Sequence, residues 1–187
     1  MNLPPPQTLG IILGASEFLL MLFRRSKQNA VSKDRHSLGL IWLVFGVSIT
    51  LGVIAAFHLP GCYLPGRNLW QPLGLGLFIA GLILRWYAIL YLGKYFTTNV
   101  AIAADHRVID TGPYRFIRHP SYTGSFLTLL GLAITFQNWA SILIIFIPCV
   151  AVMRWRIQIE EQALLEGLGE PYRAYMQRTK RLVPFVY

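Results

Sequence analysis

The segment "PSYTGSFLTLLGLAITFQNWASILIIFIPCVAVM", Pro120–Met153, contains no charged residue. A helix needs about 20 mostly apolar residues to cross a bilayer, so this run is long enough for two short crossings. The triplet Gln137–Trp139 divides it, and we therefore predict two helices joined by a tight hairpin. Because each arm is short for a bilayer, we expect the second helix to continue past Met153 into the polar segment.

Three earlier segments are also apolar, and only one of them is interrupted by a basic residue, Arg85. They are Thr8–Phe23, Leu38–Phe57 and Leu69–Gly93. The chain is 55% hydrophobic and only 13% charged, which is too little charge for a soluble domain of 187 residues. No strand alternation is visible, and backbone groups in lipid must be satisfied internally. The sequence therefore predicts an all-α polytopic membrane protein with about five transmembrane helices.

Basic residues are unevenly distributed between the predicted loops. Of 17 Lys and Arg residues, all but Arg67 and Arg85 lie in the first loop, the third loop or the tail. Loops rich in Lys and Arg stay on the cytosolic side, so we predict an N-terminus outside the cytosol and a cytosolic C-terminal region. The net charge of +9 favours an anionic membrane surface as partner, with an anionic ligand as a sharper possibility. Nucleic acid is not needed to explain it.

We divide the chain into an N-terminal three-span region, residues 1–93, and a cytosol-facing region that includes the hairpin, residues 94–187. Two polar segments flank the hairpin, Lys94–His119 before it and Arg154–Tyr187 after it. Folding of the hairpin brings these segments together. We therefore expect any catalytic or binding site to lie where they meet.

The motif "RHPSYTG" begins the uncharged run. Pro120 suits the first turn of a helix, which places His119 at the cap and Tyr122 about one turn further on. Amide groups at such a helix start attract anions. The alternative is a structural collar of Arg and Tyr side chains at the lipid headgroups.

Two adjacent carboxylates, Glu160 and Glu161, follow the hairpin. Arg156 precedes Glu160 by four residues on the same helical face, so an ion pair explains Glu160. Glu161 has no basic residue one turn away, and it is the better functional candidate. The following "LLEGLGEPYRAY" should break at Gly167 and Gly169 and restart near Pro171 as an amphipathic interfacial helix.

The linked motifs "RHPSYTG", "EE" and "GEPYRAYMQR…VPF", with the upstream "LGKYFTTNVAIAADHRVIDTGPYRFI", resemble the isoprenylcysteine carboxyl methyltransferase family. The resemblance covers Gly93–Phe185, about half of the chain. It implies S-adenosylmethionine as methyl donor, bound in a cytosol-facing pocket. The implied cofactor-binding residues are His106, Val108, Ile109, Gly112, Tyr114, His119, Tyr122 and Glu161. The implied catalytic residues are Arg178 and Glu161, and the implied substrate-binding residues are Arg178, Arg118 and Tyr175.

These residue types suit methyl transfer to a carboxylate, which is already a nucleophile and needs positioning without a general base. Arg178 can hold a carboxylate through a paired hydrogen-bond fork. Glu161 can bind the cofactor's ammonium group, and His119 with its helix start can bind the cofactor's carboxylate. We expect a lipophilic acceptor from the bilayer, such as a prenylcysteine or an isoprenoid acid, and no metal.

Other functions remain open. An amine acceptor must lose a proton, so in a phospholipid N-methyltransferase Glu161 or His119 would serve as base. The remaining alternatives are an NADPH-dependent sterol or isoprenoid reductase and a non-catalytic membrane module. "GLGLFIAG", Gly74–Gly81, lacks the spacing and the preceding strand of a dinucleotide fingerprint. As location we prefer a bacterial plasma membrane, with the endoplasmic reticulum as the alternative.

Two charged residues lie inside predicted spans, at similar depths. Glu17 is seven residues from the cytosolic end of its span, or about 10 Å, and Arg85 is nine residues from its own, or about 13 Å. Isolated charges within a membrane usually face a partner or a cavity. We predict that Glu17 and Arg85 either pair or line one polar cavity beneath the cofactor site. The alternative is that Arg85 reaches the headgroups by itself.

Overall fold

The computed structural model describes residues 3–23, 36–96 and 107–183, and its regular elements are all helices. The elements are α1 (Pro6–Phe23), α2 (His36–His58), η1 (Pro60–Cys62), α3 (Arg67–Leu92), η2 (Gly93–Tyr95), η3 (Gly112–Arg115), α4 (Pro120–Thr135), α5 (Trp139–Leu168) and α6 (Glu170–Arg178). Within these residues the only β pairing consists of two isolated bridges. The all-α prediction is confirmed. Residues 24–35, which carry the basic residues of the first predicted loop, lie outside the described part.

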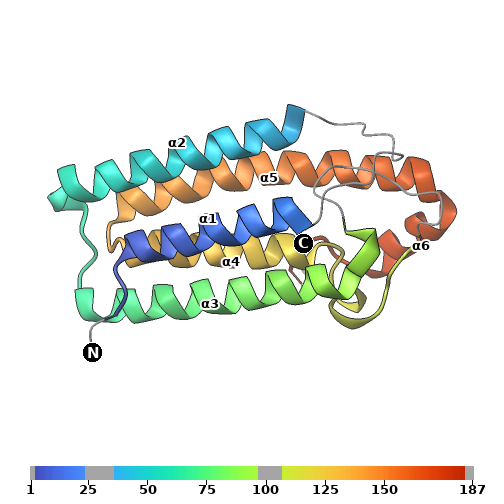
Figure 1. Ribbon diagram of the computed structural model, residues 1–187, viewed down its shortest axis with the longest axis horizontal. Helices are drawn as coiled ribbons and strands as arrows, with labels where there is room; N and C mark the ends of the chain where they lie inside the picture. The colour runs from blue at the N-terminus through green and yellow to red at the C-terminus, as the bar shows by residue number, and fades with distance from the viewer. Residues whose placement is uncertain (1–2, 24–35, 97–106, 184–187) are drawn as a thin grey trace.

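The long helices run side by side as a bundle, with α2 beside α5, α3 beside α4 and α1 across α4 (Figure 1). The short helix α6 lies at one end, and η1 lies at the other (Figure 1). Three helices, α2, α3 and α5, are long and apolar enough to cross a membrane. α1 and α4 have 18 and 16 residues and are thus about 27 and 24 Å long. The protein is an integral membrane protein, while five crossings and their orientation remain a prediction.

The predicted hairpin joins α4 to α5. Gln137 adopts φ of +57°, and the side chain of Asn138 accepts a hydrogen bond from the Ser141 amide at 3.2 Å, which caps α5. α5 has 30 residues and continues well past Met153. This confirms the prediction that its uncharged part is too short to be the whole helix. It ends at Leu168, where Gly169 turns the chain with φ of +62° into α6.

Glycines bring α3 and α4 unusually close together. A Cβ atom added to Gly124 would lie 2.5 Å from the Arg85 amide nitrogen, and one on Gly74 would lie 2.7 Å from the Gly131 carbonyl oxygen. Small residues at such positions let membrane helices approach until their backbones touch. The contact places Arg85 directly against the first turns of α4.

The segment after α6 returns to the start of α4. The amide of Arg118 donates to the Lys180 carbonyl at 2.8 Å, and the amide of His119 donates to the Arg181 carbonyl at 3.0 Å. The Thr123 hydroxyl donates to the Leu182 carbonyl at 2.8 Å. His119 is the N-cap residue of α4 and Pro120 is in its first turn, as predicted. The two polar segments that flank the hairpin therefore meet.

Candidate functional site

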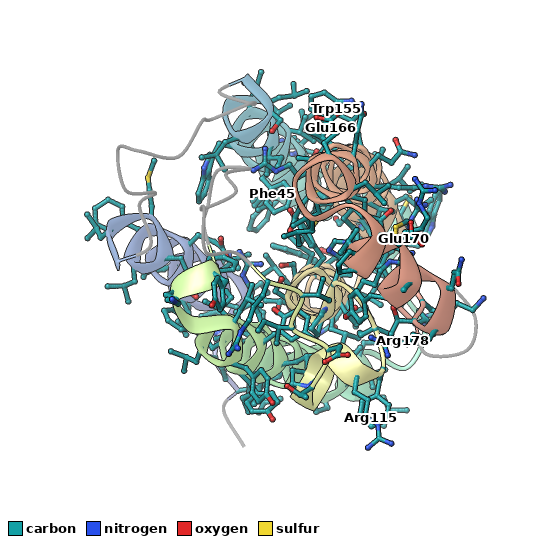
Figure 2. The ribbon with its side chains drawn as sticks, turned by 90° about the vertical axis from the view of Figure 1, so that its right-hand side faces the viewer. Phe45, Arg115, Trp155, Glu166, Glu170 and Arg178 are labelled. Atoms are coloured by element: carbon teal, nitrogen blue, oxygen red, sulfur yellow. The ribbon has the colours of Figure 1, made fainter. Side chains whose placement is uncertain are left out.

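A cavity lies in the half of the bundle nearest α6, and all six α-helices contribute to its wall. Its apolar part is formed by residues of α1, α2, α4 and α5, including Leu13, Leu20, Phe45, Leu129 and Met153. Figure 2 shows Phe45 on the inner side of α2. Its polar part is formed near the start of α4 and the end of α5, including Arg118, His119, Tyr122, Arg156 and Glu160. The cavity thus joins an apolar compartment to a charged one.

Glu161 does not line the cavity, but it contacts basic side chains at the polar end. Its carboxylate accepts hydrogen bonds from Arg118 Nε at 2.8 Å and Arg181 Nε at 2.8 Å, and His119 Nε2 lies 3.3 Å away. The side chains of Glu161 and His119 are each only 4% exposed. Arg118 also donates to the carbonyl groups of Met176 and Thr179.

These contacts divide the predicted substrate-binding residue Arg118 and the predicted cofactor-binding residues His119 and Glu161 into two groups. Arg118 and His119 line the cavity, whereas Glu161 does not, and both oxygens of Glu161 already accept hydrogen bonds. The structure therefore places Glu161 where it fixes the positions of two cavity-facing side chains. Its direct contact with a cofactor remains a prediction.

Glu160 faces the cavity, and sequence reasoning had assigned it only to Arg156. The Tyr122 hydroxyl donates to Glu160 Oε2 at 2.9 Å, and both residues line the wall. Arg156 also lines the wall, and it donates to the Ser37 hydroxyl on α2. The helical spacing that suggested an ion pair gave no indication that Tyr122 would approach from another helix.

Three tyrosines close the end of the cavity near α6. The Tyr175 hydroxyl donates to the Tyr114 carbonyl at 2.6 Å, and the Tyr114 hydroxyl donates to the Ala88 carbonyl at 3.2 Å. The Tyr172 hydroxyl is buried and has no hydrogen-bond partner among the described residues. Burial raises the pKa of Tyr114, Tyr172 and Tyr175 above the ordinary range, so all three stay protonated and can donate.

Some of the remaining predicted residues line the cavity, and others do not. Val108 and Ile109 line the cavity, and His106 lies outside the described residues. Gly112 does not line it; its φ of +57° begins η3, and an added Cβ atom would strike the Tyr91 ring. Arg178 lies outside the cavity wall, with its side chain 62% exposed, and its Nη2 is 2.7 Å from Asp110 Oδ2. Figure 2 shows Arg178 near the edge of the molecule.

The two charges predicted at one membrane depth meet in the cavity. Arg85 Nη2 donates to Glu17 Oε2 at 2.7 Å, and Arg85 Nη1 donates to the Ser125 hydroxyl at 2.5 Å. Glu17, Arg85 and Ser125 all line the cavity. The predicted pair is confirmed, and the alternative in which Arg85 reaches the headgroups by itself is excluded.

The chain is similar to known membrane methyltransferases. Residues 74–166 match the isoprenylcysteine carboxyl methyltransferase (ICMT) family. Protein-S-isoprenylcysteine O-methyltransferase B of Arabidopsis thaliana is 34% identical over 115 residues, which cover 60% of this chain and 58% of that protein. The protein-S-isoprenylcysteine O-methyltransferase of Schizosaccharomyces pombe is 30% identical over 121 residues, which cover 64% of this chain and 51% of that protein. The chain thus spans little more than half the length of these relatives.

The fold is shared as well. The structure of a eukaryotic intramembrane Ras methyltransferase, isoprenylcysteine carboxyl methyltransferase, superposes with a TM-score of 0.74 at 28% sequence identity. The superposition covers 97% of this chain and 65% of the other. Sequence match, relatives and architecture agree with the resemblance seen in the motifs. This chain is a member of the isoprenylcysteine carboxyl methyltransferase family.

Proposed function

We propose that this protein transfers a methyl group from S-adenosylmethionine to the carboxylate of a lipophilic acceptor, a prenylcysteine or an isoprenoid acid. The observation that carries the proposal is the two-part cavity, which is apolar at membrane depth and charged at the start of α4. An acceptor with an apolar chain and an ionised end requires both compartments. The names of the relatives, protein-S-isoprenylcysteine O-methyltransferases, support this substrate class.

The polar end has the groups that S-adenosylmethionine requires. When bound, this cofactor supplies an electrophilic methyl group on a positively charged sulfur. Glu160, which faces the cavity, would hold its ammonium group, and His119 with the first amides of α4 would hold its carboxylate. Val108 and Ile109 offer an apolar surface for the adenine ring, and the unpartnered Tyr172 hydroxyl offers a donor. In this proposal Glu161 acts through Arg118 and His119.

The charge of the wall favours an anionic acceptor over an amine. Among the described residues, its charged side chains are four arginines and two carboxylates: Arg85, Arg107, Arg118, Arg156, Glu17 and Glu160. Glu161 and Arg181 form an ion pair behind the wall, so the wall itself has an excess of two positive charges. This excess attracts a carboxylate, which needs only orientation beside the methyl group.

The acceptor's chain would lie among Leu13, Phe45, Leu129 and Met153, at a depth that only a lipid-soluble molecule reaches. We propose that the reacting end faces the cytosol, because the basic loops of the sequence lie on that side. A bacterial plasma membrane, rather than the endoplasmic reticulum, is part of the same proposal.

The decisive experiment uses purified protein in detergent with S-adenosylmethionine labelled in its methyl group. N-acetyl-S-farnesylcysteine should receive the label as a base-labile ester, and the same compound with its carboxylate converted to a carboxamide should receive none. If only phosphatidylethanolamine receives the label, the methyl acceptor is an amine and not a carboxylate. Absence of both cofactor binding and transfer would indicate a reductase relative or a non-catalytic module.

A further inference from the structure

The cavity wall has four arginines among the described residues, and any of them could bind the carboxylate of an acceptor. They are Arg85, Arg107, Arg118 and Arg156. Arg178, which the sequence suggested for this contact, lies outside the wall. A guanidinium group holds a carboxylate most firmly when two of its N–H groups donate side by side. The hydrogen bonds within the protein therefore decide which arginine still has such a pair of donors.

Two of the four arginines use most of their donors within the protein. Arg85 donates from Nη2 to Glu17 Oε2 at 2.7 Å and from Nη1 to the Ser125 hydroxyl at 2.5 Å, and its Nε is buried. Arg118 donates from Nε to Glu161 Oε1 at 2.8 Å and from Nη1 to two backbone carbonyls, which leaves Nη2 alone for other contacts. Neither arginine can offer two parallel donors to a ligand without breaking one of these bonds.

Arg156 is engaged as well. Its Nη1 donates to the Ser37 hydroxyl, which ties α5 to α2, and the residue is only 3% exposed. Moving this guanidinium toward a ligand would break a hydrogen bond between buried groups, which is costly. Three of the four arginines are therefore fixed by contacts within the protein.

Arg107 differs from the other three. It lines the cavity and is exposed, and no hydrogen bond or ion pair involves it within residues 3–23, 36–96 and 107–183. The acidic residue nearest to it in sequence, Asp110, is already paired with Arg178 Nη2 at 2.7 Å. Val108 and Ile109 follow it and also line the cavity, so this segment of the chain lies at the wall. The complete set of guanidinium donors of Arg107 is thus available to a ligand.

We propose that Arg107 binds the carboxylate of the methyl acceptor. The inference rests on the proposed function and deepens it, because it names the cation that holds the acceptor. It also separates the acceptor's carboxylate from the groups assigned to the cofactor's amino acid, which are Glu160, His119 and the first amides of α4. The two carboxylates, one on the acceptor and one on the cofactor, then each have donors of their own.

The reaction determines which kinetic constant depends on Arg107. A lone pair on one carboxylate oxygen forms the new bond to the methyl carbon, while the bond from this carbon to sulfur breaks and leaves its electron pair on sulfur. The products are a methyl ester and a neutral thioether, and no proton moves. Because the carboxylate loses its negative charge on the way, a cation beside it stabilises the bound substrate at least as much as the transition state. Loss of Arg107 should therefore raise the KM of the acceptor and leave kcat nearly unchanged.

Equilibrium binding tests the contact without turnover. N-acetyl-S-farnesylcysteine and its carboxamide differ only at the reacting end, and S-adenosylhomocysteine replaces the methyl donor in both measurements. The wild type in detergent should bind the acid about 10-fold more tightly, at the lower end of the range for a hydrogen bond to a charged group because Arg107 is exposed. Arg107→Gln should remove most of this preference. Arg107→Lys, which keeps the charge without the planar pair of donors, should retain part of it.

Arg173→Gln is the matched control. Arg173 is an exposed arginine on α6 that pairs with Glu170 and does not line the cavity, so its ratio of dissociation constants should equal that of the wild type. Arg107→Gln removes no contact among the described residues, so its melting temperature and its affinity for S-adenosylhomocysteine should match those of the wild type. Added salt should weaken the preference of the wild type for the acid, because exposed charges are screened.

The inference is overturned if the wild type binds the acid and the carboxamide equally or binds neither. It is also overturned if Arg107→Gln keeps the preference, or if this variant lowers kcat and leaves the KM of the acceptor unchanged. Preference for the acid without methyl transfer by the wild type would instead overturn the proposed function. Methyl transfer with a KM that does not depend on Arg107 would overturn only this contact.

Discussion

Glu161 connects two parts of the chain that are distant in sequence. It bonds to Arg118 and His119 just before α4 and to Arg181 after α6. Removing a buried carboxylate from such a cluster strands the cations that it neutralises, which costs more than the lost contact alone. Its first effect should therefore be on stability.

We expect Glu161→Gln to lower the free energy of unfolding by about 3–5 kcal/mol, measured by chemical denaturation in detergent without cofactor. Glu166→Gln, on the same helix but exposed, should leave it nearly unchanged. If Glu161→Gln keeps its stability but loses S-adenosylmethionine binding, Glu161 contacts the cofactor directly.

A double-mutant cycle measures the coupling of Glu17 and Arg85. Either Glu17→Gln or Arg85→Met alone should destabilise the protein by roughly 3–5 kcal/mol, because the remaining charge loses its partner at membrane depth. The double variant should lose less than the sum of the two. Strictly additive losses in thermal or chemical unfolding would contradict the pair.

Arg178 lies outside the cavity, and its partner Asp110 follows Val108 and Ile109 of the wall. If Arg178 acts by holding this segment, Arg178→Asp should reduce methyl transfer, and the charge swap with Asp110→Arg should restore most of it. A swap variant as inactive as the single one would favour the direct contact with an acceptor that the sequence suggested. Initial rates at saturating cofactor provide the measurement.

The contact partners of some residues could be predicted from their positions in the sequence, and those of others could not. The depths of Glu17 and Arg85 were sufficient to predict that the two charges either pair or share one cavity, because both depths follow from a fixed rise per residue. The partners of Glu161 could not be predicted this way, since Arg181 approaches from a segment with no periodic pattern. Glu160 was missed for the same reason, because Tyr122 approaches it from a different helix.

Among the elements, the contact between α3 and α4 should be the most sensitive to added volume. An added Cβ atom at Gly131 would clash with the backbone of Phe78, so Gly131→Ala should destabilise the protein by about 1–3 kcal/mol. Gly76→Ala, also within this packed pair but with open space around it, should be neutral or slightly stabilising. Similar melting temperatures for both variants would show that the helices can separate without cost.

The hairpin and the extended α5 were predictable because the uncharged run and the polar residues that divide it are local features of the sequence. The return of residues 180–182 to the start of α4 was not predictable, because its hydrogen bonds join residues about sixty positions apart. The close approach of α3 and α4 was also missed. Gly74 and Gly81 are the α3 glycines of this contact, and their spacing in the sequence does not identify the helix that faces them.

For the molecule as a whole, the cavity crosses the predicted boundary between residues 1–93 and 94–187. α1 and α2 supply much of its apolar wall, and α1 and α3 supply the Glu17–Arg85 pair, while the later helices supply most of the polar end. The three N-terminal spans, for which the sequence offered no role, thus form part of the site. We propose that they determine which acceptors fit.

The orientation of the bundle can be tested with its two native cysteines. Cys62 is in η1, at the end opposite α6, and Cys149 is buried in α5. A membrane-impermeant maleimide should label Cys62 in intact cells and not in sealed inside-out vesicles, because the basic loops predict a cytosolic site. Cys62→Ser should abolish the labelling. If Cys62 is labelled only from the cytosolic side, the topology is the reverse of the predicted one.

The pairing of Arg118 and His119 with Lys180 and Arg181 also bears on how the protein is made. A chain is synthesised from its N-terminus, so α4 and α5 can enter the membrane before Lys180 and Arg181, whose carbonyls accept from the amides of Arg118 and His119, have left the ribosome. Until then, two basic side chains stand at the head of α4 without Arg181 and the neighbouring carbonyls. The end of the cavity nearest α6 is therefore the last part of the bundle to assemble.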